Sequence, residues 1–164
     1  MRLALLLLLL APLTAGAITL PNGRSLELRP FQPAGHAAGV PPRELWRISA
    51  PDDYAYRLQR RCYCFGPKDA RVYIVQKKVA AVEDLATGRV HSDKRILELF
   101  MPLADYFDLI DRLWERQPAI FEIRHDRRFG FPARILADPA YSIADDEVDL
   151  RIGELQGLEA SPPR

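Results

Sequence analysis

Cysteine is scarce in this chain, since Cys62 and Cys64 are the only two among its 164 residues. A chain of this length can bury a sizeable core, so disulfides are not obligatory for its folding. Beyond the N-terminal segment, no apolar run approaches the roughly 20 residues that a membrane-spanning helix needs. An excess of charge is also lacking. The formal net charge is +1, which argues against non-specific binding to nucleic acid or anionic membranes, because both require a basic excess.

The first 17 residues have the pattern of an export signal. Arg2 supplies a positive charge, residues 3–11 are continuously apolar, and Ala15-Gly16-Ala17 supplies the small residues of a cleavage site. We therefore expect residues 1–17 to be a signal peptide and the mature protein to begin at Ile18, periplasmic or secreted from a bacterial cell. The alternative is a short N-terminal anchor that stays uncut. After cleavage, no membrane-spanning segment would remain.

The rest of the chain reads as a leader, a domain and a tail. Residues 18–42 are rich in proline and glycine, which interrupt helices and strands, so we expect a loosely structured leader. Only residues 25–28 alternate in hydropathy, as a short edge strand would. Residues 43–156 have regular patterns and predict a single domain. Residues 157–164 predict a flexible polar tail.

Hydrophobic periodicity within the domain predicts a helix, three strands, a second helix and three further strands. A period of two marks the strands, which we expect at residues 54–64, 72–75, 79–85, 119–124, 131–135 and 148–152. The helices are expected at 42–48 and within 105–116. In the second helix, an i, i+4, i+7 type of spacing predicts that Phe107, Ile110 and Trp114 are buried. The predicted fold class is therefore α+β, an antiparallel sheet with helices on one face in the order α-βββ-α-βββ.

Eight short segments follow one another in a recognisable order. They are Trp46, residues 54–58, Cys62-Tyr63-Cys64, residues 82–88, residues 107–110, His125-Asp126, residues 129–132 and residues 145–147. In this order they resemble the exported bacterial family called domain of unknown function 6174, over about residues 43–152. His125 departs from the pattern, which favours tyrosine at that place. The resemblance implies a bacterial envelope setting and a single domain, and it implies no activity.

The two cysteines favour a disulfide, because an exported protein meets an oxidising compartment. In a straight strand the Cα atoms of Cys62 and Cys64 would lie about 6.6 Å apart, at the long end of disulfide reach. A turn or bulge at Tyr63 would bring them within range. Arg60 and Arg61 precede the pair and would favour the thiolate. We expect a structural bond, and a redox-active pair is the alternative, since a tight ring is easily reduced.

Other groupings of chemistry-bearing residues favour structural roles. The residues of a candidate zinc site match no short zinc-binding motif; they are Cys62, Cys64, His91 and His125. The residues of a candidate calcium site lack the spacing of an EF-hand and are more typical of a solvated acidic turn; they are Asp138, Asp145, Asp146 and Glu147. His125 and Asp126 are adjacent on a predicted strand and would point to opposite faces, which disfavours an acid–base pair.

The absence of a convergent catalytic set favours a binding protein over an enzyme. Ser92 and Ser142 lie outside any nucleophile-elbow pattern, so we expect no catalytic residue, and we expect no metal or cofactor. The preferred hypothesis is a non-enzymatic envelope module that binds an unknown protein or small ligand through one sheet face. The first alternative is a thiol–disulfide redox protein or sensor that uses Cys62 and Cys64. The second is a structural module of a larger assembly.

Overall fold

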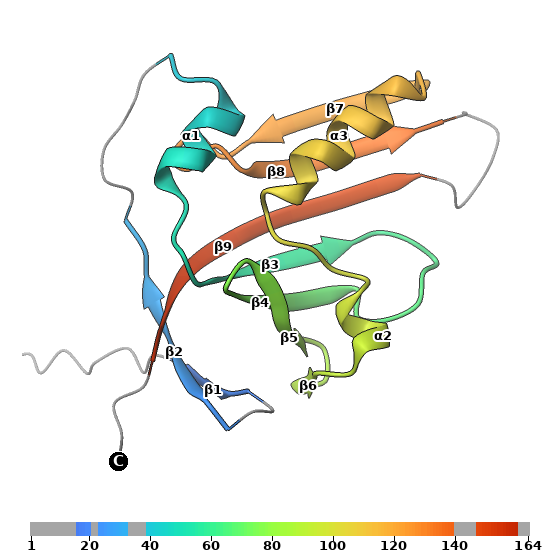
Figure 1. The fold of residues 1–164 in the computed structure, drawn as a ribbon. Helices are drawn as coiled ribbons and strands as arrows, with labels where there is room; N and C mark the ends of the chain where they lie inside the picture. Colours follow the sequence, from blue (N-terminus) through green and yellow to red (C-terminus); the bar gives the residue numbers. More distant parts are fainter. Residues whose placement is uncertain (1–15, 21–22, 33–38, 140–146, 161–164) are drawn as a thin grey trace, which may run out of the picture.

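A computed structural model describes residues 16–20, 23–32, 39–139 and 147–160 (Figure 1). Several of the sequence predictions concern residues outside these ranges. The apolar core of the predicted signal peptide lies outside the described residues, as do Asp145 and Asp146 of the predicted acidic turn.

The described residues form one sheet of nine strands, together with short helices. In chain order the elements are β1 (Ala17–Thr19), β2 (Ser25–Pro30), α1 (Pro42–Ser49), β3 (Tyr54–Arg60), β4 (Asp69–Val75), β5 (Lys78–Asp84), β6 (Arg89–His91), α2 (Lys94–Leu97), α3 (Asp105–Glu115), β7 (Ile120–His125), β8 (Pro132–Asp138) and β9 (Val148–Ala160). The helices that the sequence predicted at 42–48 and within 105–116 correspond to α1 and α3.

Strand β9 organises the sheet, because it pairs with three other strands. Its first residues pair with β8 and its last residues pair with β2, while β3 runs along its other edge. The main path of the sheet is β1-β2-β9-β3-β4-β5-β6, and β7 extends the sheet beyond β8. The register between β3 and β9 shifts between Ala55 and Arg57, and Glu154 has a φ of 50°. Such a bulge bends a strand and increases its twist, and it lies where β9 passes from β8 to β2.

The predicted α+β class is wrong. Strands account for 45% of the described residues and helices for 18%, and the strands form a curled half-barrel rather than a sheet with a layer of helices. The predicted order also lacked β1, β6 and α2, and it did not include β2, although residues 25–28 were expected to be able to form a short edge strand. The physical reason lies in β9. This long strand pairs first with β8 and then with β2, and its bend turns the part of the sheet that contains β2 and β1 away from the part that contains β7 and β8.

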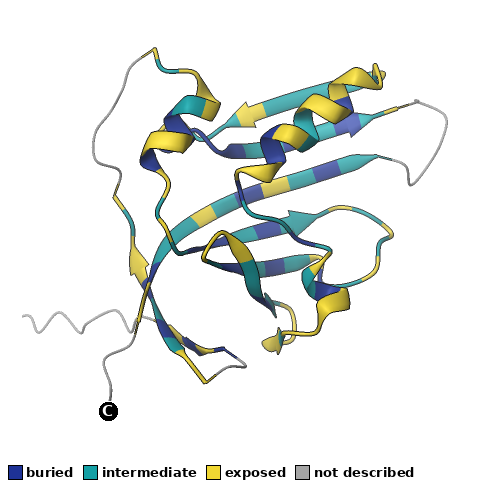
Figure 2. Cartoon of the chain, in the orientation of Figure 1, coloured by how far each residue is buried: buried dark blue, intermediate teal, exposed yellow. Residues whose placement is uncertain are grey.

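Buried residues recur along the strands of the sheet (Figure 2). They form two apolar clusters, one on each side of the sheet. On the side that α1 and α3 occupy, here the helix side, the larger cluster includes Tyr56 and Leu58 of β3 and Trp46 of α1. On the opposite side, Leu26 of β2 packs with Tyr73 of β4 in the smaller cluster. The segment predicted as a loose leader therefore contains a strand whose apolar residues are buried.

Two predicted details at the ends of elements need correction. Phe107 is buried and Ile110 is partly buried, as predicted, but Trp114 is 64% exposed. In the last turn of α3 the inward position is taken by Leu113, and Trp114 only meets the edge strand β7 through the ring of Phe121, with centroids 5.2 Å apart. At the C-terminus, β9 continues to Ala160, beyond the predicted start of a flexible tail.

Candidate functional site

The cysteines lie on a loop and not on a strand. Strand β3 ends at Arg60, and the chain then bends at Cys62 and Tyr63, so the predicted continuation of the strand to Cys64 is wrong. The bend brings the two Cα atoms to 5.2 Å, with the sulfur atoms 1.90 Å apart. The pair is thus at disulfide distance, and the turn at Tyr63 that this required is present. Residues 61–68, which connect β3 to β4, are called the cysteine loop below.

The base of the cysteine loop is held tightly against the rest of the protein. Pro67 is buried. Gly66 has a φ of +86°, which favours glycine, and a Cβ at this position would lie 2.6 Å from Cδ1 of Leu99, so the end of that side chain would have to shift. The guanidinium of Arg60 donates a hydrogen bond to the carbonyl of Phe65, at 3.3 Å. These contacts fix where the tip of the loop points.

The tip of the loop presents aromatic rings beside cations. Tyr63 is 92% exposed and Phe65 is 54% exposed. The Nζ of Lys68 lies 5.4 Å from the centroid of the Tyr63 ring, and the guanidinium carbon of Arg95 lies 4.3 Å from that of Phe65. A hollow of about 480 Å³ lies beside Phe65 and is lined also by Lys68 and Ile96.

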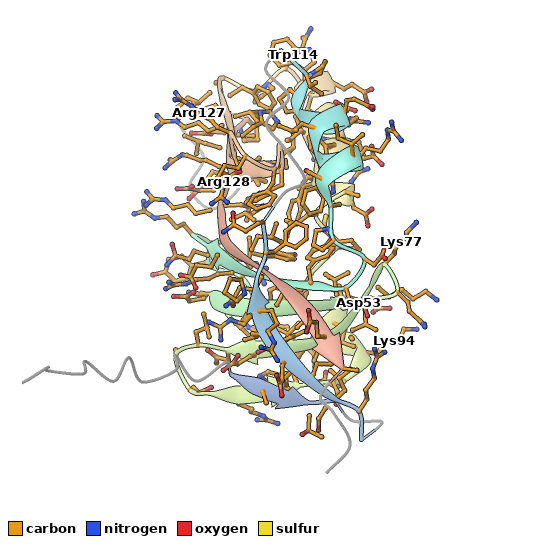
Figure 3. All side chains as sticks on the ribbon, turned by 90° about the vertical axis from the view of Figure 1, so that its left-hand side faces the viewer. Asp53, Lys77, Lys94, Trp114, Arg127 and Arg128 are labelled. Atoms are coloured by element: carbon orange, nitrogen blue, oxygen red, sulfur yellow. A yellow bond between two sulfur atoms is a disulfide. The ribbon has the colours of Figure 1, made fainter. Side chains whose placement is uncertain are left out.

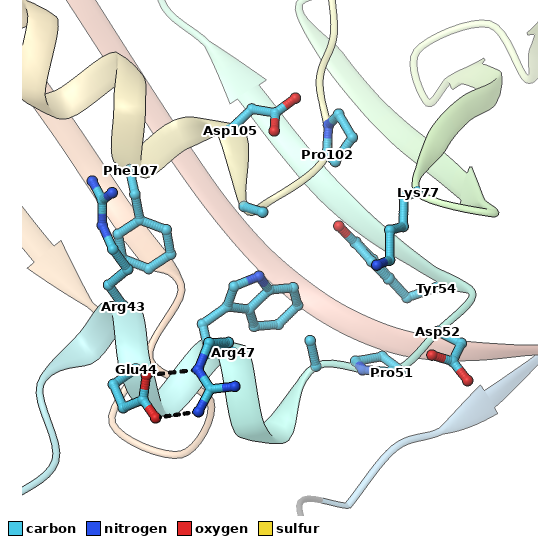
Figure 4. Close-up of a pocket in the computed structure, with 13 residues that line it drawn as sticks. Arg43, Glu44, Arg47, Pro51, Asp52, Tyr54, Lys77, Pro102, Asp105 and Phe107 are labelled. Carbon is cyan, nitrogen blue, oxygen red and sulfur yellow. Dashed lines mark hydrogen bonds and ion pairs between the residues drawn. The ribbon is translucent and has the colours of Figure 1, made fainter.

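A larger groove lies between α1, the start of α3 and the β4–β5 turn (Figure 4). Its volume is about 580 Å³. Its floor contains buried aromatic side chains, which are Trp46, Tyr54 and Phe107. Its rim carries charged side chains of both signs, which are Arg43, Glu44, Arg47, Asp52, Lys77 and Asp105.

The floor of the groove is rigid because its rings are fixed by packing and hydrogen bonds. Trp46 meets Tyr54 edge-on, with centroids 5.5 Å apart, and meets Phe131 edge-on at 5.9 Å. The Tyr54 hydroxyl accepts a hydrogen bond from the backbone N–H of Leu103 at 2.9 Å, and burial raises the pKa of Tyr54. Gly130 packs directly against the start of α1, since a Cβ there would lie 2.3 Å from the carbonyl oxygen of Pro42.

Part of the charge on the rim is neutralised by ion pairs. Glu44 accepts two hydrogen bonds from Arg47, at 2.7 and 2.5 Å, and these bonds lower the pKa of Glu44. Arg43 turns toward α3, where it binds Asp108 at 3.2 Å and Asp111 at 2.5 Å.

The remaining rim charges form no ion pair or side-chain hydrogen bond among the described residues: Lys77, Asp52 and Asp105. Arg112 acts on Asp105 only through a weaker electrostatic attraction. Desolvation, and then the neighbouring Asp108, raise the pKa of Asp105. A positive charge placed near Asp105 would stabilise its carboxylate and so lower its pKa again.

The other residues considered in the sequence are not brought together. No group of three or more His, Cys, Asp or Glu side chains able to hold a metal ion occurs among the described residues, so Cys62 and Cys64 have neither His91 nor His125 beside them in such a group. The ring of His125 stacks on Phe107, and burial lowers its pKa.

Asp126 has a structural role in the β7–β8 turn. Its carboxylate accepts hydrogen bonds from the backbone N–H groups of Arg128 and Phe129, both at 2.8 Å. This bonding is typical of a turn residue. It explains the presence of the Asp126 carboxylate without any acid–base role.

Sequence reasoning missed the groove. Its residues come from α1, the segment after it, the β4–β5 turn and the start of α3. The only signal in the sequence was the amphipathic segment 42–48 with its tryptophan, which predicted a helix packed on the core and not an opening beside it.

Comparison with known proteins places the chain in one family. A family described as a family of unknown function, DUF6174, matches residues 40–157, and this range contains both the cysteine loop and the groove. The resemblance seen in the sequence is therefore confirmed as to family. No curated protein and no solved structure matches the chain. Among the helices in the described ranges, none has the length and apolar character needed to cross a membrane.

Proposed function

The chain belongs to this family of unknown function, DUF6174, and we propose that it is an exported, non-enzymatic module that binds a small ligand in the groove. The observation that carries the proposal is a hollow of about 580 Å³ with an aromatic floor and a charged rim. Small-ligand sites have volumes of about 300 to 1,000 Å³ and combine apolar walls with a few charged groups. A rigid floor favours binding, because little side-chain motion is lost when a ligand arrives.

The unpaired rim groups indicate the charge of the ligand. Asp52 and Asp105 outnumber Lys77, and the raised pKa of Asp105 means that its environment disfavours an isolated carboxylate. Aromatic rings attract cations to their faces. We therefore assign the groove to a ligand with an apolar or aromatic body and an ammonium group, with Asp105 as the principal charged contact.

Trp46 provides a direct readout of binding. Replacing the exposed Trp114 by Phe leaves Trp46 as the only tryptophan, because the chain contains two. We expect phenethylamine, an aromatic ammonium, to change the fluorescence of Trp46 with a Kd of about 1 mM or tighter. Phenylacetate has the same ring with a negative charge and should bind more weakly.

Variants on α3 test the charge assignment. Asp105→Asn should raise the Kd for phenethylamine about fivefold, the factor that corresponds to about 1 kcal/mol for a partly exposed ion pair. Glu115→Gln lies on the same helix, outside the groove, and should leave the Kd unchanged. The absence of any fluorescence change with either probe would contradict a binding groove. Equal affinity for both probes would contradict the charge assignment.

Thiol–disulfide chemistry is the second candidate function. It is supported by the position of the cysteines on a projecting loop that follows Arg60 and Arg61, since nearby cations favour the thiolate. Thiol titration of unreduced protein, followed by equilibration in glutathione buffers, separates the two roles. Resistance to reduction would support a structural bond, because structural disulfides have low reduction potentials. Ready reduction of the Cys62–Cys64 bond in the folded protein would favour a redox function.

A further inference from the structure

The cysteine loop is a rigid support for exposed aromatic side chains. Tyr63 lies between two cysteines whose Cα atoms are only 5.2 Å apart, and it is nevertheless 92% exposed. At the base of the loop, Gly66 packs closely against Leu99, and Arg60 donates a hydrogen bond to the carbonyl of Phe65, so the loop is tied to the rest of the protein on both sides of its tip. Within the described residues this large ring contacts the ammonium group of Lys68, which leaves nearly all of its surface open to a partner.

The cations beside these rings are available to a partner. Lys68 and Arg95 contact the rings of Tyr63 and Phe65, and neither has a carboxylate partner in the part of the chain that the structure describes. The carboxylates around them are already bonded within the chain, to Arg57, to backbone N–H groups or to Lys94. They are Asp69, Asp84, Asp93 and Glu98.

We propose that the cysteine loop docks an acidic protein partner, with Tyr63 as the anchor. Tyrosine and arginine are enriched among the residues that dominate protein interfaces. Preorganisation of the loop lowers the ordering cost of binding. Lys68 and Arg95 pair with carboxylates on the partner, and the hollow of about 480 Å³ beside Phe65 receives one of its side chains. This surface is separate from the groove. The proposal of a protein partner at the cysteine loop therefore does not depend on the proposal of a ligand in the groove.

Charge complementarity favours a protein over a lipid surface. An anionic membrane would attract Lys68 and Arg95. It would repel Asp93, the N-cap residue of α2, while Glu98 at the other end of α2 is paired with Lys94. A protein partner can place its carboxylates opposite the cations alone. The chain as a whole also lacks the basic excess that membrane attraction needs, with a net charge of +1.

Photocrosslinking in the native host tests the proposal on the full chain. Tyr63→p-benzoylphenylalanine places the crosslinker at the anchor, and Trp114→p-benzoylphenylalanine is the matched control, because Trp114 is also exposed and stands at the far end of the molecule from Lys94 (Figure 3). We expect a protease-sensitive adduct of one defined mass from position 63 and none from position 114. The double charge reversal Lys68→Glu with Arg95→Glu should reduce its yield about tenfold or more.

Further controls make every outcome decisive. The reversal Arg112→Glu with Arg116→Glu, in and after the last turn of α3, should leave the adduct unchanged. Thermal midpoints of all variants should match that of the parent, because the substituted side chains are exposed. No adduct, an equal adduct from position 114, or an adduct insensitive to the Lys68 and Arg95 reversal would overturn the proposal.

A lipid target is tested separately with vesicles. We expect no cosedimentation with vesicles of phosphatidylcholine and phosphatidylglycerol in a ratio of about seven to three, a composition that supplies a negative surface potential. Cosedimentation that is lost in Tyr63→Ala would assign the loop to a membrane surface and would overturn the protein partner.

Discussion

On the helix side of the sheet, β3 presents Tyr54, Tyr56 and Leu58, none of which is more than 5% exposed. On the opposite side, the same strand presents Arg57 and Gln59, which bond to carboxylates and remain partly exposed. Alternation along a strand sends neighbouring residues to opposite sides, so one short segment belongs to two environments. Residues on the two sides belong to the same strand and have the same backbone environment. A difference in stability between substitutions on the two sides therefore reflects the surroundings of the side chains.

The ion pairs on the opposite side form a connected network. Arg57 binds Asp69 through two hydrogen bonds, at 2.8 and 2.6 Å, and binds Glu154 at 2.7 Å. Arg71 extends the network to Glu83 at 3.3 Å. About a third of the Arg57 and Asp69 side chains is exposed, and such pairs contribute about 0–1 kcal/mol each. Burial of a large apolar side chain contributes about 1.5–3 kcal/mol, so each buried side chain of the helix side contributes more than an ion pair of this network.

The largest expected effect compares adjacent residues of β3. Leu58→Ala should lower the free energy of unfolding by about 2–5 kcal/mol, because it opens a cavity in the core. Arg57→Ala should lower it by about 1 kcal/mol or less. Urea denaturation of both variants measures the difference. Equal losses would show that the network matters as much as the core.

Two glycines with positive φ test how closely α1 is held on the helix side. At Gly130 an added Cβ would meet the backbone of α1, whereas at Gly88 nothing lies within 4 Å. Gly130→Ala should cost about 2–4 kcal/mol, from backbone strain and crowding together. Gly88→Ala should cost about 1–2 kcal/mol, from strain alone. Similar losses in thermal unfolding would mean that α1 can shift away from the β7–β8 turn.

A smaller effect comes from a buried hydroxyl. Tyr56 donates a hydrogen bond to the carbonyl of Met101 at 2.5 Å, which ties β3 to the segment before α3. Tyr56→Phe leaves that carbonyl without this partner and should cost about 1–3 kcal/mol. Tyr63→Phe, on the exposed loop, should change stability by less than about 0.5 kcal/mol. A neutral Tyr56→Phe would indicate that water replaces the hydroxyl.

The smallest effect is the acid sensitivity of the opposite side. Hydrogen bonds from Arg57 lower the pKa of Asp69 below its usual 3.8, so the folded state favours the carboxylate. The stability that this provides is present above pH 3.8 and is lost as the pH falls through the lowered pKa. The parent protein should therefore exceed Asp69→Asn in stability by less than about 1 kcal/mol at pH 7.

The pH dependence itself is the measurement. Urea midpoints of the parent and of Asp69→Asn should converge as the pH falls below 3.8. Arg57→Gln should show a deficit at pH 7 that is at least as large, because it also loses the bond to Glu154. A difference between the parent and Asp69→Asn that persists in acid would mean that the substitution disturbs packing and not charge.

Much of the local structure was predictable from periodicity. The alternation of β3 placed Tyr54, Tyr56 and Leu58 on one side, and the pattern of α3 placed Phe107 in the core. The prediction for Trp114 was wrong because the apolar face of α3 continues past the edge of the sheet that covers it. Periodicity does not show where that edge lies. The groove could not be predicted, because its walls come from segments that meet only after folding.

The sequence by itself determined the family, the helices α1 and α3 and the side that β3 turns toward the core, because these depend on neighbours within a few residues. Tertiary structure decided the rest. The pairing of Leu28 with Leu158 joins the two ends of the chain, and no local pattern encodes a partner so distant. The bulge at Glu154 then bends β9, so that α1, α3 and the β4–β5 turn frame a groove. Long-range pairing and curvature arise only when the whole sheet assembles.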